Sequence, residues 1–421
     1  MRDRTPFVTV TGVGLVTALG QSVADTWNAL ARGRSGITAL RPPVGGCLAG
    51  ATIAGLAPPT DLRVPKHAKF MGRAAMCGVR AMLDAVAAAG LRSSGLEPAA
   101  IGVYTGTGET GLDAGEFFPA LDHAWRQDPS LDFRHVCGPA SKLVDPYFSL
   151  RTLSNGTAAL SAIELPAHGP SINFVQGATA SAHALACACD DLEEQKIAAA
   201  VVIGCDALVT TASLLAYTRE GLLSPRPPDD ACRPFSAPGD GFVLGEAAAA
   251  VVLESDREAR ARGARRLGTV RGVGFAATPG GGPGATDETH EFDACVRAIS
   301  AAGGSDDAGC VFAFGDPTPR GGQVELACLA SAFGRSVPVT TLTGALGYVG
   351  AATSLVQVAV ALHSLAAGVP AAVRAGHQGH PTAIDLVLGA PRALHAGQTT
   401  VCLARSFTAE HAALVVAEAA P

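Results

Sequence analysis

The sequence predicts an α/β fold made of two similar halves, and three observations support this prediction. Short strand-like runs alternate with segments whose apolar residues recur at helical spacing. Runs such as 199–204 and 242–253 are almost continuously apolar, which is typical of a sheet covered on both faces. The pattern at the start of the chain also returns in its second half.

The expected elements follow one another along the chain without a low-complexity linker. We expect strands at residues 7–14, 101–105, 199–204 and 242–253, and helices at 23–32, 67–89 and 181–194. Within 67–89, Met71, Val79, Met82 and Val86 lie at helical spacing. The charged segment 256–266 is predicted to be the end of a surface helix, and the Gly-rich segment 279–284 a surface loop.

Two repeated sequence patterns indicate that the two halves arose by duplication. Val-Thr-Val-Thr-Gly-Val-Gly begins at Val8, and Gly-Thr-Val-Arg-Gly-Val-Gly begins at Gly268. The predicted pattern of a helix followed by a strand at 181–204 is repeated at 351–373. We therefore expect an N-terminal half at 1–256 and a C-terminal half at 257–421. The alternative is that short Val-Gly turns recur by chance.

Composition narrows the class of protein. Hydrophobic residues make up 48% of the 421 residues, charged residues make up 16%, and the net charge is −6. This balance argues against disorder and against a nucleic-acid binder, which needs a concentrated basic face. Apolar runs stay shorter than about 18 uninterrupted residues, so we expect no membrane span. The 11 cysteines are scattered through apolar segments, which favours a cytoplasmic protein over a disulfide framework.

The sequence gives little support for a cofactor or a metal. Gly106-Thr-Gly-Glu-Thr-Gly matches a dinucleotide-binding pattern, but the polar, Pro-broken region after it lacks the expected acidic residue at a strand end. His183, Cys187 and Cys189 have no paired ligands at metal-binding spacing. We expect neither a cofactor nor a metal.

Several motifs resemble the β-ketoacyl-acyl carrier protein synthases (ketosynthases) of the thiolase fold. The opening Val-Thr-Gly-Val-Gly-Leu-Val-Thr-Ala resembles their first strand, and Asp240-Gly-Phe-Val-Leu-Gly-Glu-Ala resembles their central signature. Gly169-Pro-Ser-Ile leads into the segment that holds their nucleophile, and Thr343-Gly resembles the turn before their last active-site His. The resemblance spans nearly the whole chain and implies a layered α-β-α-β-α arrangement.

The family's catalytic positions are replaced. The nucleophilic Cys aligns with Ala178, the first His with Phe314, the second His with Ala345, and a Lys with Thr340. In active members the Cys forms an acyl thioester and the two His stabilise the enolate that decarboxylation produces. Methyl and phenyl groups can do neither, so we expect no catalytic residue at these positions.

This loss is similar to that in the chain-length factors of type II polyketide systems. The resemblance implies a heterodimer with an active ketosynthase, a tunnel for the growing chain, and an acyl carrier protein that delivers it. Alternatives are an acyltransferase or malonyl decarboxylase that uses other groups, such as Ser181 and His183, or a homodimeric scaffold. The product, whether polyketide, fatty-acid-like chain or polyene, stays open.

The resemblance also implies where the interface and the tunnel lie. The strand at 171–176, with Phe174, is the candidate for pairing with the partner. The segment 110–119 carries the tunnel candidates Leu112, Glu116, Phe117 and Phe118. The two adjacent Phe rings either line the tunnel or pack inside this subunit.

Overall fold

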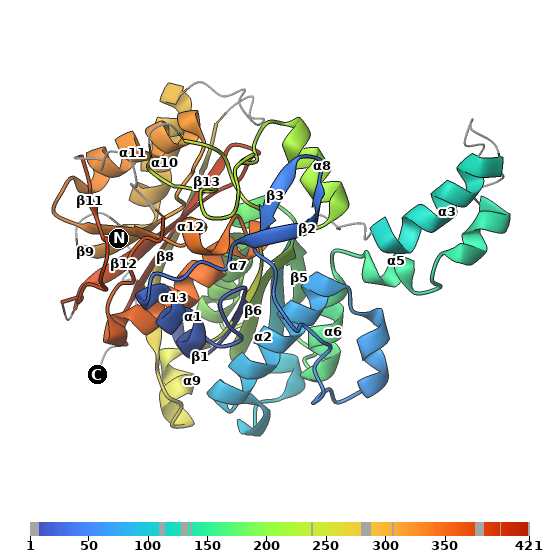
Figure 1. The fold of residues 1–421 in the computed structure, drawn as a ribbon. Helices are drawn as coiled ribbons and strands as arrows, with labels where there is room; N and C mark the ends of the chain where they lie inside the picture. The colour runs from blue at the N-terminus through green and yellow to red at the C-terminus, as the bar shows by residue number, and fades with distance from the viewer. Residues whose placement is uncertain are drawn as a thin grey trace.

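The computed structural model describes residues 8–108, 114–127, 134, 137–236, 239–278, 288–304, 307–374, 383–395 and 397–419 (Figure 1). The strands are β1 (Val8–Thr17), β2 (Thr38–Val44), β3 (Cys47–Gly50), β4 (Ile101–Thr107), β5 (Ser171–Phe174), β6 (Ala199–Ala207), β7 (Glu246–Ser255), β8 (Gly268–Ala277), β9 (Ala308–Ala313), β10 (Pro338–Thr341), β11 (Asp385–Leu386), β12 (Thr399–Arg405) and β13 (Glu410–Ala417). The helices are α1 (Val23–Ala31), α2 (Arg73–Ala89), α3 (Ala114–Gln127), α5 (Phe148–Arg151), α6 (Gly156–Glu164), α7 (Ala180–Glu193), α8 (Thr211–Arg219), α9 (Asp256–Ala261), α10 (Glu288–Ala301), α11 (Pro319–Phe333), α12 (Thr343–Leu346) and α13 (Thr353–Ala367). Short 3-10 turns include η1 (Pro65–Phe70), η4 (Pro139–Leu143), η5 (Gly177–Thr179) and η6 (Gly350–Ala352).

The main sheet repeats one topology twice. Among the described residues its strand order is β11-β10-β9-β12-β13-β8-β1-β7-β6-β4-β5. In the first half β5, β4 and β6 are parallel, whereas β7 and β1 are antiparallel additions. In the second half β10, β9, β12, β13 and β8 follow the same order and directions. The predicted duplicated α/β fold is therefore confirmed, and the halves meet where β1 pairs with β8.

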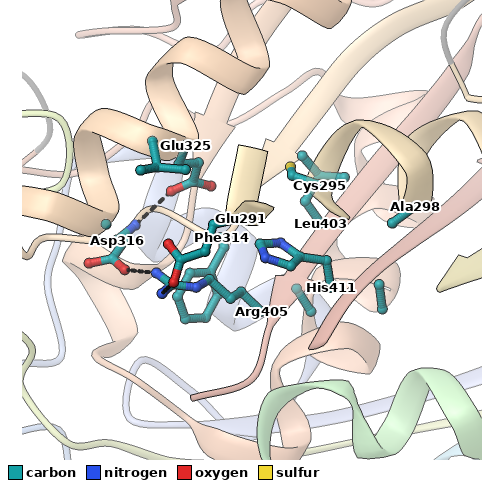
Figure 2. Close-up of a pocket in the computed structure, with 13 residues that line it drawn as sticks. Glu291, Cys295, Ala298, Phe314, Asp316, Glu325, Leu403, Arg405 and His411 are labelled. Atoms are coloured by element: carbon teal, nitrogen blue, oxygen red, sulfur yellow. Dashed lines mark hydrogen bonds and ion pairs between the residues drawn. The ribbon is translucent and has the colours of Figure 1, made fainter. Parts of the chain in front are cut away.

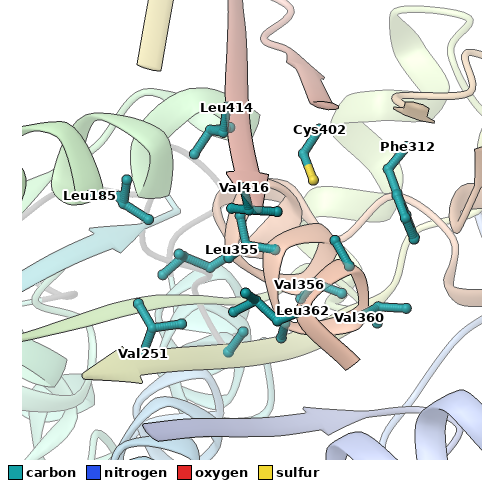
Figure 3. Packing of buried hydrophobic residues seen from close by; sticks show 14 of the residues in the cluster. Leu185, Val251, Phe312, Leu355, Val356, Val360, Leu362, Cys402, Leu414 and Val416 are labelled. Carbon is teal, nitrogen blue, oxygen red and sulfur yellow. The ribbon is translucent and has the colours of Figure 1, made fainter. Parts of the chain in front are cut away.

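Helices cover both faces of each half-sheet. Helices α7 and α13 lie in the middle layer, where Leu185, Leu355 and Val360 pack in one apolar cluster with strand residues from both halves (Figure 3). A second cluster joins α2 to the outer face of the first half, and a third joins α10 and α11 to the outer face of the second. Along β7, Val251 belongs to the middle cluster and Val252 to the outer one, because successive side chains of a strand point to opposite faces. This accounts for the continuously apolar strands.

Close packing of backbone explains why Gly-Val-Gly occurs in both halves. A Cβ atom on Gly12 would lie 2.2 Å from the Ala85 carbonyl oxygen of α2. A Cβ atom on Gly274 would lie 2.2 Å from the Ala298 carbonyl oxygen of α10. Each first strand thus passes so close to its outer helix that a side chain cannot fit. The repeated pattern is a packing requirement of the fold.

Some element predictions differ from the structure. The predicted helix at 67–89 is the turn η1 followed by α2, because residues 71 and 72 are extended between them. The segment 351–373 does not reproduce the helix-then-strand pattern of 181–204. It contains α13, but the strand that corresponds to β6 is β12, about 30 residues further along the chain than the end of α13. The loop predicted at 279–284 lies outside the described residues.

Helix α13 also bears on the expectation of no membrane span. In the described part of the chain, residues 350–367 form one stretch long and apolar enough to cross a membrane. Within that stretch, 78% is buried inside the protein, between the two half-sheets. Its hydropathy is thus that of a core helix.

Candidate functional site

Ala178 lies in η5, between the end of strand β5 and the start of helix α7. Its side chain is fully buried, and its carbonyl oxygen accepts a hydrogen bond from Ser354 Oγ on α13 at 3.0 Å. A helix N-terminus favours an anionic group such as a thiolate, but the methyl group of Ala178 offers none. Ala178 thus lies, buried, in the turn that precedes α7, and its side chain carries no nucleophilic group.

Aromatic rings fill the space around Ala178. We call Tyr217, Phe242, Phe314, Tyr348 and Phe407 the aromatic cluster. Ala178 and these rings belong to one apolar cluster of side chains. The Phe314 ring lies 5.8 Å from Phe242 and 6.2 Å from Tyr348, centroid to centroid, and Tyr348 lies 5.0 Å from Phe407. The structure thus places Ala178 and Phe314 in one apolar cluster that is rich in aromatic rings.

The other two positions that the sequence predicts to be replaced, Thr340 and Ala345, are buried and bonded to backbone groups. The hydroxyl of Thr340 is used inside the fold, because its Oγ1 donates to the Pro370 carbonyl oxygen at 2.7 Å. Ala345, in α12, is fully buried in the middle-layer cluster, and its carbonyl oxygen accepts from the Gly36 amide at 2.8 Å. Neither side chain supplies a donor toward Ala178.

Ser181 and His183 do not form a nucleophile and base pair. Ser181 Oγ is buried and accepts from the Leu355 amide at 3.4 Å. His183 Nε2 lies 2.9 Å from Glu410 Oε1, and its ring stacks on Phe275 with centroids 4.0 Å apart. The two side chains therefore bond to different partners.

A buried charged cluster, which no sequence motif indicated, lines a small cavity together with Phe314 (Figure 2). Arg405 donates to Asp316 Oδ2 at 2.7 Å and to Glu291 Oε1 at 2.8 Å. Glu325 accepts from the amides of Gly315 and Asp316. With His411, these groups line a small cavity of about 20 Å³.

Burial shifts the titration of this cluster. It raises the pKa of Glu325 to about 7, although the two backbone amides favour its charged form. Burial, together with the positive charge of Arg405, lowers the pKa of His411 to about 3. Among the described residues, His411 Nε2 has no hydrogen-bond partner. Near pH 7, His411 is therefore neutral, and Glu325 lies close to its midpoint.

The predicted interface and tunnel residues lie on the edge of the molecule. Phe174 is on β5, the last strand of the sheet, where its ring is partly buried against the middle-layer cluster. Glu116, on α3, pairs with Arg151 at 3.0 Å and lines a groove of about 440 Å³. Phe117 stacks on Phe148 with centroids 5.6 Å apart, whereas Phe118 is 47% exposed. Leu112 lies outside the described residues.

The residues that sequence reasoning missed are those whose partners are distant in sequence. Phe242 was within a quoted motif, but nothing local indicated that it meets Phe407. Arg405 belongs to no motif of the sequence analysis, yet it bonds acids 89 and 114 residues away. The pairing of Arg405 with Asp316 and Glu291 has no periodic pattern that a sequence would reveal.

Comparison with known proteins identifies the fold and the family of this chain. The chain superposes on the ishigamide ketosynthase/chain length factor with a TM-score of 0.84 at 21% identity, covering 99% of this chain and 100% of that one. The fold is thus the thiolase-like fold of ketosynthases. The family model described as Beta-ketoacyl synthase, N-terminal domain, matches residues 6–259. The chain belongs to the β-ketoacyl synthase family.

Two curated relatives show the range of proteins that it resembles. It is 31% identical to the tetracenomycin polyketide synthase ketoacyl synthase beta subunit of Streptomyces glaucescens, over 97% of this chain and 98% of that protein. It is 32% identical to 3-oxoacyl-(acyl-carrier-protein) synthase 2 of Synechocystis sp. over 276 residues, which are 64% of this chain and 62% of that protein. The similarity thus includes both a synthase and a beta subunit.

Proposed function

We propose that this chain is a non-catalytic ketosynthase-like subunit, a chain-length factor, that pairs with an active ketosynthase in type II polyketide or fatty-acid-like biosynthesis. In this role it shapes the tunnel that receives the growing chain, while an acyl carrier protein delivers that chain to the partner. The division into halves at 1–256 and 257–421 belongs to the same proposal. The observation that carries it is Ala178, which lies in η5 just before α7 and belongs to the same apolar cluster as Phe314.

The chemistry of the site supports a non-catalytic role. Acyl transfer by this family of folds requires a nucleophile at the helix start and donors that face a developing oxyanion. Here Ala178 belongs to an apolar cluster rich in aromatic rings, and the nearby hydroxyls are engaged: Ser354 by a backbone carbonyl, Thr179 by Glu410, and Tyr348 by the Ala178 backbone and Tyr217. No observation in the described residues favours an alternative acyltransferase or decarboxylase site.

The outer edge of β5 supports pairing with a second chain. On its inner side β5 is bonded to β4, and Val103 donates to the Pro170 carbonyl oxygen. On its outer side no strand pairs with it in the part of the chain that the structure describes. An open edge with partly buried Ile172 and Phe174 is a ready template for a partner strand.

The arm, which we define as residues 114–127 and 137–153, supports the same conclusion. In Figure 1 its helices α3 and α5 stand away from the rest of the molecule. Its internal apolar cluster consists of three alanines with Val144 against them. Meanwhile Phe118, Trp125 and Leu143 are about half exposed. Exposed apolar area of this kind is stabilised by a covering partner, at about 25 cal/mol per Å².

Copurification tests the pairing. We expect this chain, tagged and coexpressed with a ketosynthase-like chain that retains its Cys and both His, to elute as a heterodimer. When this chain is expressed alone, we expect a lower yield of soluble protein. A chain that forms only a homodimer, even with the partner in excess, would favour the scaffold alternative.

Acylation tests the missing chemistry. We expect no adduct on this chain when the pair is incubated with acyl carrier-protein thioesters, because Ala178 cannot form a thioester. Intact-mass spectrometry of both subunits makes the partner an internal positive control. A stable adduct that maps to a residue around Ala178, and not to an exposed thiol such as Cys137, would contradict the proposal.

A further inference from the structure

Two cysteines outside the proposed site lie unusually close to each other. Cys295 is on α10 and Cys328 is on α11, 33 residues apart in the sequence. Their Sγ atoms are 2.6 Å apart. Cys328 is fully buried and Cys295 is 7% exposed. Both belong to the apolar cluster that joins these helices to the second half-sheet.

The two sulfurs are in direct contact. Non-bonded carbon atoms, which are smaller than sulfur, prefer about 3.5–4.0 Å. A disulfide bond measures about 2.05 Å. The two sulfurs are therefore nearer to bonding distance than to ordinary contact. The packing of α10 against α11 places the two side chains next to each other, and both are enclosed by the core.

Cys295 also lines the small cavity beneath Phe314 and His411 (Figure 2). A cavity of about 20 Å³ holds one water-sized group. It therefore offers room for the single oxygen atom of a sulfenic acid on Cys295. Cys328 does not line this cavity, so Cys295 is the sulfur that a small oxidant meets first.

We propose that Cys295 and Cys328 form an oxidisable pair that closes to an intramolecular disulfide with a peroxide. Cys295 sulfur attacks the O–O bond of hydrogen peroxide, which yields a sulfenic acid and one water. Cys328 sulfur then attacks the Cys295 sulfur and expels the second water. Two thiols and one peroxide thus give one S–S bond and two waters, and two electrons pass from sulfur to oxygen.

The reaction should be slow compared with that of an exposed thiol. The hydrogen bond from Cys328, followed by burial, raises the pKa of the Cys295 thiol. Since the thiolate is the reactive form, the pair should need more peroxide than Cys137, the exposed cysteine of the arm. Once closed, the buried bond should resist reduction.

Peptide mapping tests this proposal. The full chain, with Cys137→Ser to remove the exposed thiol, is reduced, treated with hydrogen peroxide, denatured and alkylated. We expect the intact mass to fall by about 2 Da before alkylation, and a digest to contain one linked peptide pair joining Cys295 to Cys328. Recovery of both cysteines in alkylated form, or linkage of either to another cysteine, would overturn the proposal.

Two variants sharpen the result. Cys295→Ser should abolish the mass loss and leave Cys328 alkylated, whereas Cys189→Ser, at a buried cysteine of α7, should leave the link intact. Oxidation should also raise the unfolding temperature of the parent protein, since the link restricts its unfolded chain, but not that of Cys295→Ser. If Cys295→Ser does not fold, the map of the parent protein still decides.

Discussion

Glu325 and His411 are both buried beneath Phe314, but burial moves their pKa values in opposite directions. Glu325 holds its proton in the folded state up to about pH 7, whereas the unfolded chain releases it near 4.3. Stability from this group is therefore present at low pH and is lost as pH rises toward 7. His411 stays neutral when folded down to about pH 3, whereas the unfolded chain is protonated below about 6.5. Its contribution is present above that value and is lost as pH falls.

These two effects should offset each other between about pH 4.5 and 6.5. Glu325→Gln removes the first effect, so the free energy of unfolding of this variant relative to the parent should increase with pH by up to about 1.4 kcal/mol per unit. His411→Gln should show the opposite slope. Urea unfolding at about pH 5, 6 and 7 measures both differences. Parallel pH profiles for the parent and Glu325→Gln would show that Glu325 is already ionised throughout this range.

At the scale of elements, the contact between β1 and α2 depends on a missing side chain. Gly12→Ala would place a methyl group 2.2 Å from the Ala85 carbonyl oxygen, so the strand and the helix must move apart. We expect a loss of about 2–3 kcal/mol in the free energy of unfolding, as for overpacked cores. Gly156→Ala is the matched control, since its new Cβ would meet nothing nearer than 3.8 Å. Equal stability of the two variants in urea unfolding would contradict this packing argument.

The register of β5 selects the residue that best tests pairing with a partner. Val103 pairs with Ser171 and bonds to Pro170, so in the parallel pattern the amides of Ile172 and Phe174 face β4. The amide of Ser171 therefore faces outward. Phe174→Pro would break the bond to β4 as well as disturb the edge, which makes it a less specific test than Ser171→Pro.

Ser171→Pro should weaken the heterodimer while the subunit stays folded, because proline removes one outward donor and leaves the ladder to β4. Ser171→Ala keeps the amide and should pair as the parent does. Analytical ultracentrifugation of the coexpressed pair measures the difference, and circular dichroism checks folding. Undiminished association of the proline variant would place the interface elsewhere.

At the scale of the whole molecule, the arm separates two phenylalanines that are adjacent in sequence. Phe117 stacks on Phe148 inside the arm, whereas Phe118 is half exposed and available to a partner. If the arm reaches the partner's tunnel as proposed, Phe118→Ala frees space there, and the product should lengthen by about one or two extension units. Product mass from the reconstituted pair measures this.

Phe117→Ala is the matched control, because it removes a ring that packs on the arm itself. It should lower the stability of the arm without a defined change in product length. Unchanged products from both variants, with the complex still assembled, would place the stop on another surface.

Sequence by itself determined the fold class and predicted the loss of the family's catalytic side chains. Both depend on local information, since apolar periodicity reports which faces are buried and the motifs predict that Ala178 and Phe314 stand where a Cys and a His would. The prediction that 351–373 repeats the helix-then-strand pattern of 181–204 was wrong. The connection between α13 and β12 is longer than that between α7 and β6, and periodicity does not report loop length.

Only the tertiary structure decided what surrounds those positions. Phe242, Phe314, Tyr348 and Phe407 come from four separate segments and meet only when both halves of the sheet are assembled. The same holds for Arg405 with its acids and for the two sulfurs of α10 and α11. The physical reason is that packing and charge pairing depend on distance in space, which a folded chain sets through contacts far apart in sequence.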